Sequence, residues 1–205
     1  MFSKQTVERI NYEVEDGSTI KKFHESSAIY RCIVGDEGVK AAAFEVGYYL
    51  PFYVFEHYKV NKTRWIVVGG GSEELIELIE SIKKMFPWGT YHVQKRHLEI
   101  CYPNDIQASL FFRQSDSWAS FATMAATGVW VDGICNPGAR EIGQRAGRYP
   151  SKKEGVKFTS KWVIETLGED DVSYNLLSQY NWIAPPPNIK FIGEKPDKNY
   201  EGFWL

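Results

Sequence analysis

Apolar positions along the chain recur in two patterns, which predict strands and helices in succession. Residues 28–34 (AIYRCIV) form a short apolar run typical of a buried strand, and residues 39–58 continue with helical spacing after a turn that contains glycine. We expect this helix to bend or break near Pro51, because proline cannot donate a backbone hydrogen bond inside a helix.

The same unit of strand, turn and helix appears a second time. Residues 64–71 (RWIVVGGG) are an apolar run closed by three glycines, and residues 72–86 (SEELIELIESIKKMF) carry apolar side chains at helical spacing. Ser72 is expected to cap this helix. Acidic residues in its first turn and lysines in its last turn favour the two ends of the helix dipole.

Four further strands are expected at residues 97–102, 109–113, 127–132 and 161–166. The first two are separated by a Pro-Asn-Asp turn, so they form a hairpin or adjacent strands. Alternating strands and helices predict an α/β layered fold in a single domain. Residues 184–205 are rich in Pro, Asn, Gly and Lys and are expected to form an irregular C-terminal tail, in which residues 189–192 are the one candidate strand.

Composition limits the function classes that fit. With 205 residues, 43% of them hydrophobic and 24% charged, the chain is expected to bury one core and is not a disordered protein. A net charge of -2 gives no overall attraction to nucleic acid, so DNA binding requires a local patch. The charged N-terminus and the lack of a long apolar run indicate neither export nor membrane insertion, and a cytoplasmic protein is expected.

Cysteine and histidine suggest no metal site or redox site. Three cysteines without a CxxC pair are expected to be buried free thiols in a reducing compartment. The four histidines, His24, His57, His92 and His97, lack metal-ligand spacing and are expected to be surface or core polar residues.

Several segments, taken in order, resemble the N-terminal ATPase domain of phage terminase large subunits. They are KKFHES (21–26), the glycine turn, RWIVV (64–68), ATGVWVDG (126–133) and GQRAGRYPSKKEG (143–155). The resemblance implies a P-loop NTPase-like fold of the ASCE type, with a mostly parallel sheet flanked by helices. It places this domain at residues 21–183 after an N-terminal extension at 1–20, and the protein in the cytoplasm of an infected or lysogenic host cell. The family's nuclease domain is not expected, because too few residues follow Thr166.

The loop that this family uses to bind ATP is altered here. A P-loop holds phosphate with backbone N–H groups, a lysine and a magnesium-binding Ser or Thr. Gly35 and Gly38 match the loop's glycines, but Lys40 stands one place early and two alanines follow it. Asp36 and Glu37 add charge that repels phosphate. We therefore expect poor ATP binding and no cofactor.

The acidic motif of the resemblance is also incomplete. The family ends this strand in two acids, one for magnesium and one to activate water, whereas this chain has Asp132 followed by Gly133. Asp132 either retains a water-mediated metal contact or is an acid in a turn. Residues 69–71 replace a third motor motif, and we interpret them as a plain turn between strand and helix rather than an anion site. No catalytic residue and no metal ligand are assigned.

One segment is strongly basic. Between residues 140 and 161 seven arginines and lysines stand against two glutamates. The resemblance implies that Arg145 and Arg148 contact DNA or a neighbouring subunit, and Lys152 and Lys153 fit phosphate contact. The alternative for the lysines is a solvated loop. The implied partners are DNA, terminase, portal or other packaging proteins, or a second copy of the chain, and no membrane.

Three functions are compatible with these observations. The first is a non-catalytic terminase-like protein that binds and thereby modulates or inhibits DNA packaging. The second is an active packaging ATPase that uses Lys40 in a shifted register with ATP and magnesium. The third is a virion structural or host-directed interaction protein that reuses the fold.

Overall fold

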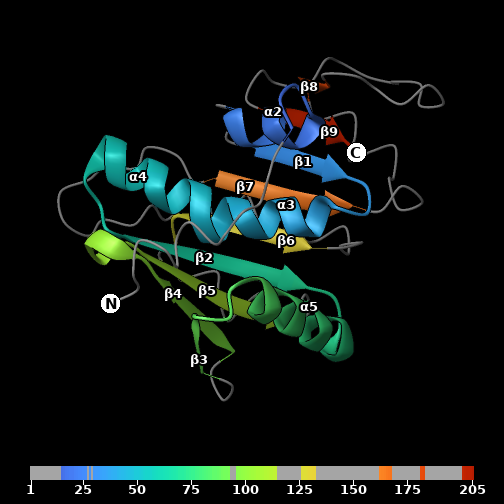
Figure 1. Ribbon diagram of the computed structural model, residues 1–205. Helices are drawn as coiled ribbons and strands as arrows, with labels where there is room; N and C mark the ends of the chain where they lie inside the picture. The colour runs from blue at the N-terminus through green and yellow to red at the C-terminus, as the bar shows by residue number, and fades with distance from the viewer. Residues whose placement is uncertain are drawn as a thin grey trace.

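A single sheet organises the protein (Figure 1). The computed structural model describes residues 15–26, 28, 30–92, 96–114, 126–132, 162–167, 181–182 and 200–205. Within them nine strands pair in the order β3-β4-β5-β2-β6-β7-β1-β9-β8. Their bounds are β1 Tyr30–Val34, β2 Lys62–Gly69, β3 Thr90–His92, β4 His97–Cys101, β5 Gln107–Gln114, β6 Gly128–Asp132, β7 Trp162–Leu167, β8 Asn181–Trp182 and β9 Tyr200–Trp204.

The strands from β5 to β8 in that order pair in parallel, and only β3 with β4 and β4 with β5 pair antiparallel among the described strands. The helices are α2 Thr19–Glu25, α3 Gly38–Phe44, η1 Glu45–Tyr49 (a π turn), α4 Leu50–Tyr58, α5 Ser72–Met85 and η3 Pro103–Asp105 (a 3₁₀ turn). Figure 1 shows α2 to α5 on one side of the sheet, where the core lies around Trp65, Trp130 and Phe112.

The expected fold class is confirmed as a mixed α/β single domain with a mostly parallel sheet. Both predicted units of strand, turn and helix are present, as β1 with α3 and as β2 with α5. The predicted cap of α5 is wrong, because Gly71 occupies the N-cap position and Ser72 is the first helical residue. The strands on either side of the Pro-Asn-Asp turn are adjacent and antiparallel, as expected.

The long helix changes its hydrogen bonding just before Pro51. The backbone N–H of Leu50 donates to the Glu45 carbonyl, which is the five-residue spacing of a π turn. Pro51 has no N–H to give to Gly47, four residues earlier. The Gly47 carbonyl instead accepts the Tyr102 hydroxyl at 2.6 Å, and burial raises the pKa of that tyrosine, so the donor keeps its proton. The predicted bend is thus a π turn that a distant tyrosine satisfies.

The segment expected to be an irregular C-terminal tail contains a strand among its described residues. Residues 200–204 form β9, which pairs in parallel with β1 along its whole length. The surrounding sequence is rich in polar and turn residues and gives no local signal for this strand. Its five residues belong to the sheet only because they pair with β1. The candidate strand at residues 189–192 lies outside the described residues. At the other end, the proposed boundary at residue 20 falls inside α2, which begins at Thr19.

Two smaller expectations can be compared with the fold. Cys32 is buried and free, and burial raises the pKa of its thiol well above the ordinary value. Cys101 is also free and half-buried, whereas Cys135 lies outside the described residues. Within the part of the chain that the structure describes, no helix combines the length and apolarity needed to cross a membrane.

Gly128 of β6 lets the strands on either side, β2 and β7, pack closely against it, and this contact can be tested. A Cβ at residue 128 would lie 2.4 Å from Trp65 Cζ3 and 2.6 Å from the Trp162 backbone oxygen. Since the backbone cannot retreat, Gly128→Ala should destabilise the protein by about 1–3 kcal/mol in urea unfolding. Gly70→Ala is the control, because its nearest neighbour would be at an ordinary 3.5 Å. Equal unfolding midpoints for the two variants would contradict this account.

Candidate functional site

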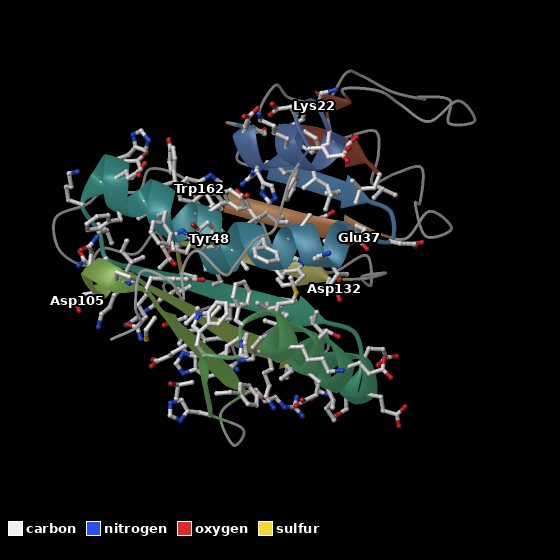
Figure 2. All side chains as sticks on the ribbon, in the orientation of Figure 1. Lys22, Glu37, Tyr48, Asp105, Asp132 and Trp162 are labelled. Carbon is white, nitrogen blue, oxygen red and sulfur yellow. The ribbon has the colours of Figure 1, made fainter. Side chains whose placement is uncertain are left out.

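The carboxyl ends of the central strands bring the turn after β1 close to Asp132. In the parallel register, Thr166 of β7 pairs with Ile33 on one side and with Asp132 on the other. Asp132 therefore lies two strand spacings from Ile33, about 10 Å. Figure 2 labels Glu37 and Asp132 at this same edge. The fold thus places both segments at the carboxyl edge of the parallel strands, where open α/β sheets commonly bind ligands.

The turn between β1 and α3 is short and closed. The Gly38 N–H donates to the Gly35 carbonyl at 3.0 Å, and α3 begins at Gly38 itself. Gly35 has φ +125°, a conformation that glycine adopts at little cost. A P-loop leaves successive N–H groups pointing at an anion. Here the N–H of Gly38 is bonded within the turn.

The side chains after this turn do not rebuild a phosphate site. Lys40 lies on the exposed surface of α3, where its Nζ is 3.4 Å from Glu37 Oε2. Such an exposed pair contributes about 0–1 kcal/mol. Ala41 and Ala42 are fully buried in the core and have no side-chain oxygen for a magnesium ion. Gly35, Gly38 and Lys40 therefore lie together, with Lys40 directed to a neighbouring carboxylate.

Asp132 is hydrogen-bonded to Thr166, which is not among the site residues predicted from the sequence. The Thr166 hydroxyl donates to Asp132 Oδ1 at 2.5 Å, and the Trp130 indole N–H donates to the same hydroxyl at 3.2 Å. Thr166 is a polar residue near the end of an apolar strand, a position that could have marked it. Only the register of β6 and β7 shows that its partner is Asp132. The acid is thus oriented by the neighbouring strand.

The three-glycine turn after β2 has the features of a plain turn. A Cβ on Gly71 would lie 2.8 Å from Glu74 Oε2, so the carboxylate of α5 folds back over the start of its own helix. A carboxylate at this end of a helix is favoured by the helix dipole. The same charge makes the turn a poor site for phosphate.

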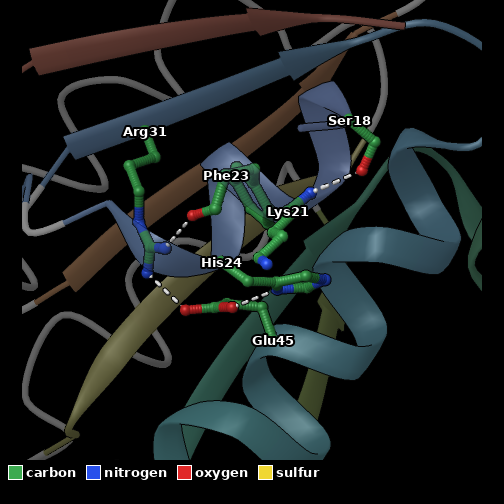
Figure 3. A network of polar contacts seen from close by, with 6 residues as sticks. All are labelled: Ser18, Lys21, Phe23, His24, Arg31 and Glu45. Carbon is green, nitrogen blue, oxygen red and sulfur yellow. Dashed lines mark hydrogen bonds and ion pairs between the residues drawn. The ribbon is translucent and has the colours of Figure 1, made fainter. Parts of the chain in front are cut away.

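A buried polar network lies between the strand before the turn and the helix after it (Figure 3). Glu45, Arg31 and His24 have side chains that are only 1%, 1% and 4% exposed. Glu45 Oε1 accepts Arg31 Nη2 at 2.7 Å, and Glu45 Oε2 lies 2.5 Å from His24 Nδ1. Arg31 Nη1 also donates to the Phe23 carbonyl at 2.6 Å. We call these residues the Glu45 network.

Aromatic rings complete the Glu45 network. The His24 ring stacks on Tyr49 with centroids 4.1 Å apart, and the Arg31 guanidinium lies 5.0 Å from the Phe23 ring centroid. Of the two expected positions for His24, surface or core, its buried side chain confirms the core. For the other residues of the Glu45 network, the sequence carried one signal, a glutamate within an apolar helix.

Two further expectations concern the residues that follow Asp132 and the metal ligands. Gly133 and the basic segment with Arg145, Arg148, Lys152 and Lys153 lie outside the described residues, so their roles stay predictions. Among the residues that are described, no group of three or more His, Cys, Asp or Glu side chains is placed to hold a metal ion.

Comparison with known proteins gives a result only at the level of structure. No family model matches the sequence, and no curated protein matches it. Among solved structures, the large terminase ATPase domain of Thermus phage P74-26 is similar with a TM-score of 0.61 and 13% identity, over 98% of this chain and 84% of that one. An arginine-to-alanine mutant of the same domain gives 0.61 and 15%, over 99% and 85%.

This chain has the fold of a large terminase ATPase domain. The resemblance in the sequence is confirmed at that level, over nearly the whole length. At 13–15% identity, this likeness shows the fold alone and leaves the chemistry to the residues present.

The Glu45 network can be tested through stability. Arg31→Met leaves a buried carboxylate without its guanidinium partner and should cost about 3–5 kcal/mol in urea unfolding, because an uncompensated buried charge is poorly solvated. The double variant Arg31→Met with Glu45→Met should recover part of that loss. Lys83→Met is the control, since its pair with Glu80 at 2.8 Å is at the surface and should cost under about 1 kcal/mol. A loss in Arg31→Met no larger than in Lys83→Met would argue against the network.

Proposed function

We propose that this protein is a non-catalytic, terminase-like protein that acts by binding, and that it modulates or inhibits DNA packaging in a viral or prophage setting. The observation that carries the proposal is the turn between β1 and α3. Its Gly38 N–H is bonded to the Gly35 carbonyl, its nearest lysine pairs with Glu37, and alanines stand where a magnesium-binding hydroxyl is needed.

Asp132 adds support from the second motif. Hydrolysis by in-line attack needs a group that orients and activates water, in addition to a metal-orienting acid. The residue after Asp132 is a glycine, which has no side chain to accept a proton. One Asp132 oxygen already accepts the Thr166 hydroxyl. The two altered motifs, which the fold places at one edge of the sheet, support the same proposal.

The terminase-like fold suggests the kind of partner. A domain that keeps the shape of a motor ATPase while lacking its chemistry is suited to bind what the motor binds: DNA, another packaging component or a second copy of itself. Pull-down with an intact large terminase subunit, a small subunit and a portal protein separates these partners. Binding to the large subunit would favour interference by mimicry.

Nucleotide chemistry gives the direct test. Calorimetry of the purified full chain with ATP and magnesium should show no saturable binding, and phosphate release should equal that of Lys40→Ala. This variant is the matched control, because Lys40 is the lysine nearest the turn and its loss leaves the buried core untouched. Tight binding and hydrolysis that disappear in Lys40→Ala would establish the active ATPase in a shifted register instead.

DNA binding through the basic segment is a separate prediction. Labelled duplex DNA should bind the full chain in fluorescence anisotropy, with an affinity that falls steeply as salt rises. Reversing charge at Lys152 and Lys153 to glutamate should weaken binding by about tenfold or more and flatten the salt dependence. The control reverses Lys22 and Lys84, two exposed lysines outside the basic segment.

Equal binding by the two charge-reversed proteins would remove the basic segment from the proposal. If the wild-type chain bound neither DNA nor nucleotide, a virion structural or host-directed role for the fold would be favoured.

A further inference from the structure

The end of β9 reaches the turn that replaces the P-loop. Each residue of β1 from Tyr30 to Val34 pairs with one of β9, and the ladder continues one step further. The Leu205 N–H donates to the Val34 carbonyl at 2.8 Å. Leu205 is therefore fixed beside the first residue of the turn, and Figure 1 shows this end of the chain at the carboxyl end of β1.

Leu205 packs directly on Gly35. A Cβ built on Gly35 would lie 2.8 Å from Leu205 Cβ and 3.3 Å from the Leu205 carbonyl oxygen. Glycine is thus required at residue 35 for two reasons, its positive φ and the closeness of the leucine. Leu205 is itself 38% exposed, so it covers the turn from the surface of the protein.

An aromatic contact also attaches β9 to α2. Phe203 is 1% exposed, and its ring meets that of Phe23 edge to face at 5.4 Å. Phe23 belongs to α2, and its carbonyl accepts the Arg31 guanidinium of the Glu45 network. A continuous set of contacts therefore joins β9, α2 and the helix that follows the turn.

We propose that residues 200–205 act as a strap that holds the turn at residues 35–38 shut. A phosphate-binding loop needs open space above its backbone N–H groups, and here Leu205 lies against the first glycine of the turn. This proposal rests on the proposed function in one respect, because the strap gives a second reason why the turn would exclude an anion. Access of an anion to the turn then depends on whether β9 stays paired with β1 and Leu205 stays packed on Gly35.

Hydrogen exchange of the full chain tests the strap without any nucleotide. The amide to follow is that of Gly38, whose hydrogen bond to Gly35 closes the turn. Shortening the covering side chain in Leu205→Ala should raise its exchange a few-fold, and removing the Cβ in Leu205→Gly should raise it about tenfold, because local opening becomes easier. Amides of α5 should exchange as in wild type. Ile76→Ala is the control, since Ile76 is an exposed apolar residue on α5, away from the turn.

Unchanged exchange at Gly38 in both Leu205 variants would overturn the strap. If Leu205→Gly unfolds the whole chain, α5 amides exchange faster as well, and Leu205→Ala then decides between the two results. This readout is independent of the proposed function. ATP hydrolysis by the wild-type chain would refute the non-catalytic proposal, whereas the strap is judged only by exchange at the turn.

Discussion

Burial of the Glu45 carboxylate constrains how this protein can be built. A carboxylate removed from water is stable only when charged or polar groups replace its hydration, and here Arg31 and His24 do so. Arg31 comes from the strand before the turn and Glu45 from the helix after it, so their pairing links the two elements across the turn. His24 brings α2 to the same point. The network thus joins α2, β1 and the helix after the turn.

Around that turn, the described side chains are engaged in ordinary packing and surface pairing. Alanines at residues 41 and 42 are buried, Lys40 pairs with Glu37 at the surface, and Leu205 covers Gly35. Each is unremarkable alone. Together with the hydrogen bond from the Gly38 N–H to the Gly35 carbonyl, they make this strand-to-helix connection a closed turn.

The π turn shows how a local rule and a distant residue combine. Pro51 cannot donate to Gly47, so the helix changes its spacing and leaves a carbonyl that needs a donor. Tyr102, from the segment between β4 and β5, supplies its hydroxyl at 2.6 Å. Gly47 also allows Phe86 close to the helix, since a Cβ there would lie 2.8 Å from that ring. The irregular helix is therefore a packed and satisfied part of the core.

The sequence by itself determined the elements whose signals are local. Apolar periodicity located β1, β2, β6, β7 and α5, proline marked the irregular helix, and the missing Lys-Ser/Thr ending was visible without coordinates. Tertiary structure alone decided which residues meet. The Thr166 contact with Asp132, the Glu45 network, and the seating of β9 with Leu205 on Gly35 join positions far apart in the chain. Pairing of parallel strands sets such contacts through register and sheet order, and neither is encoded in the spacing of neighbouring residues.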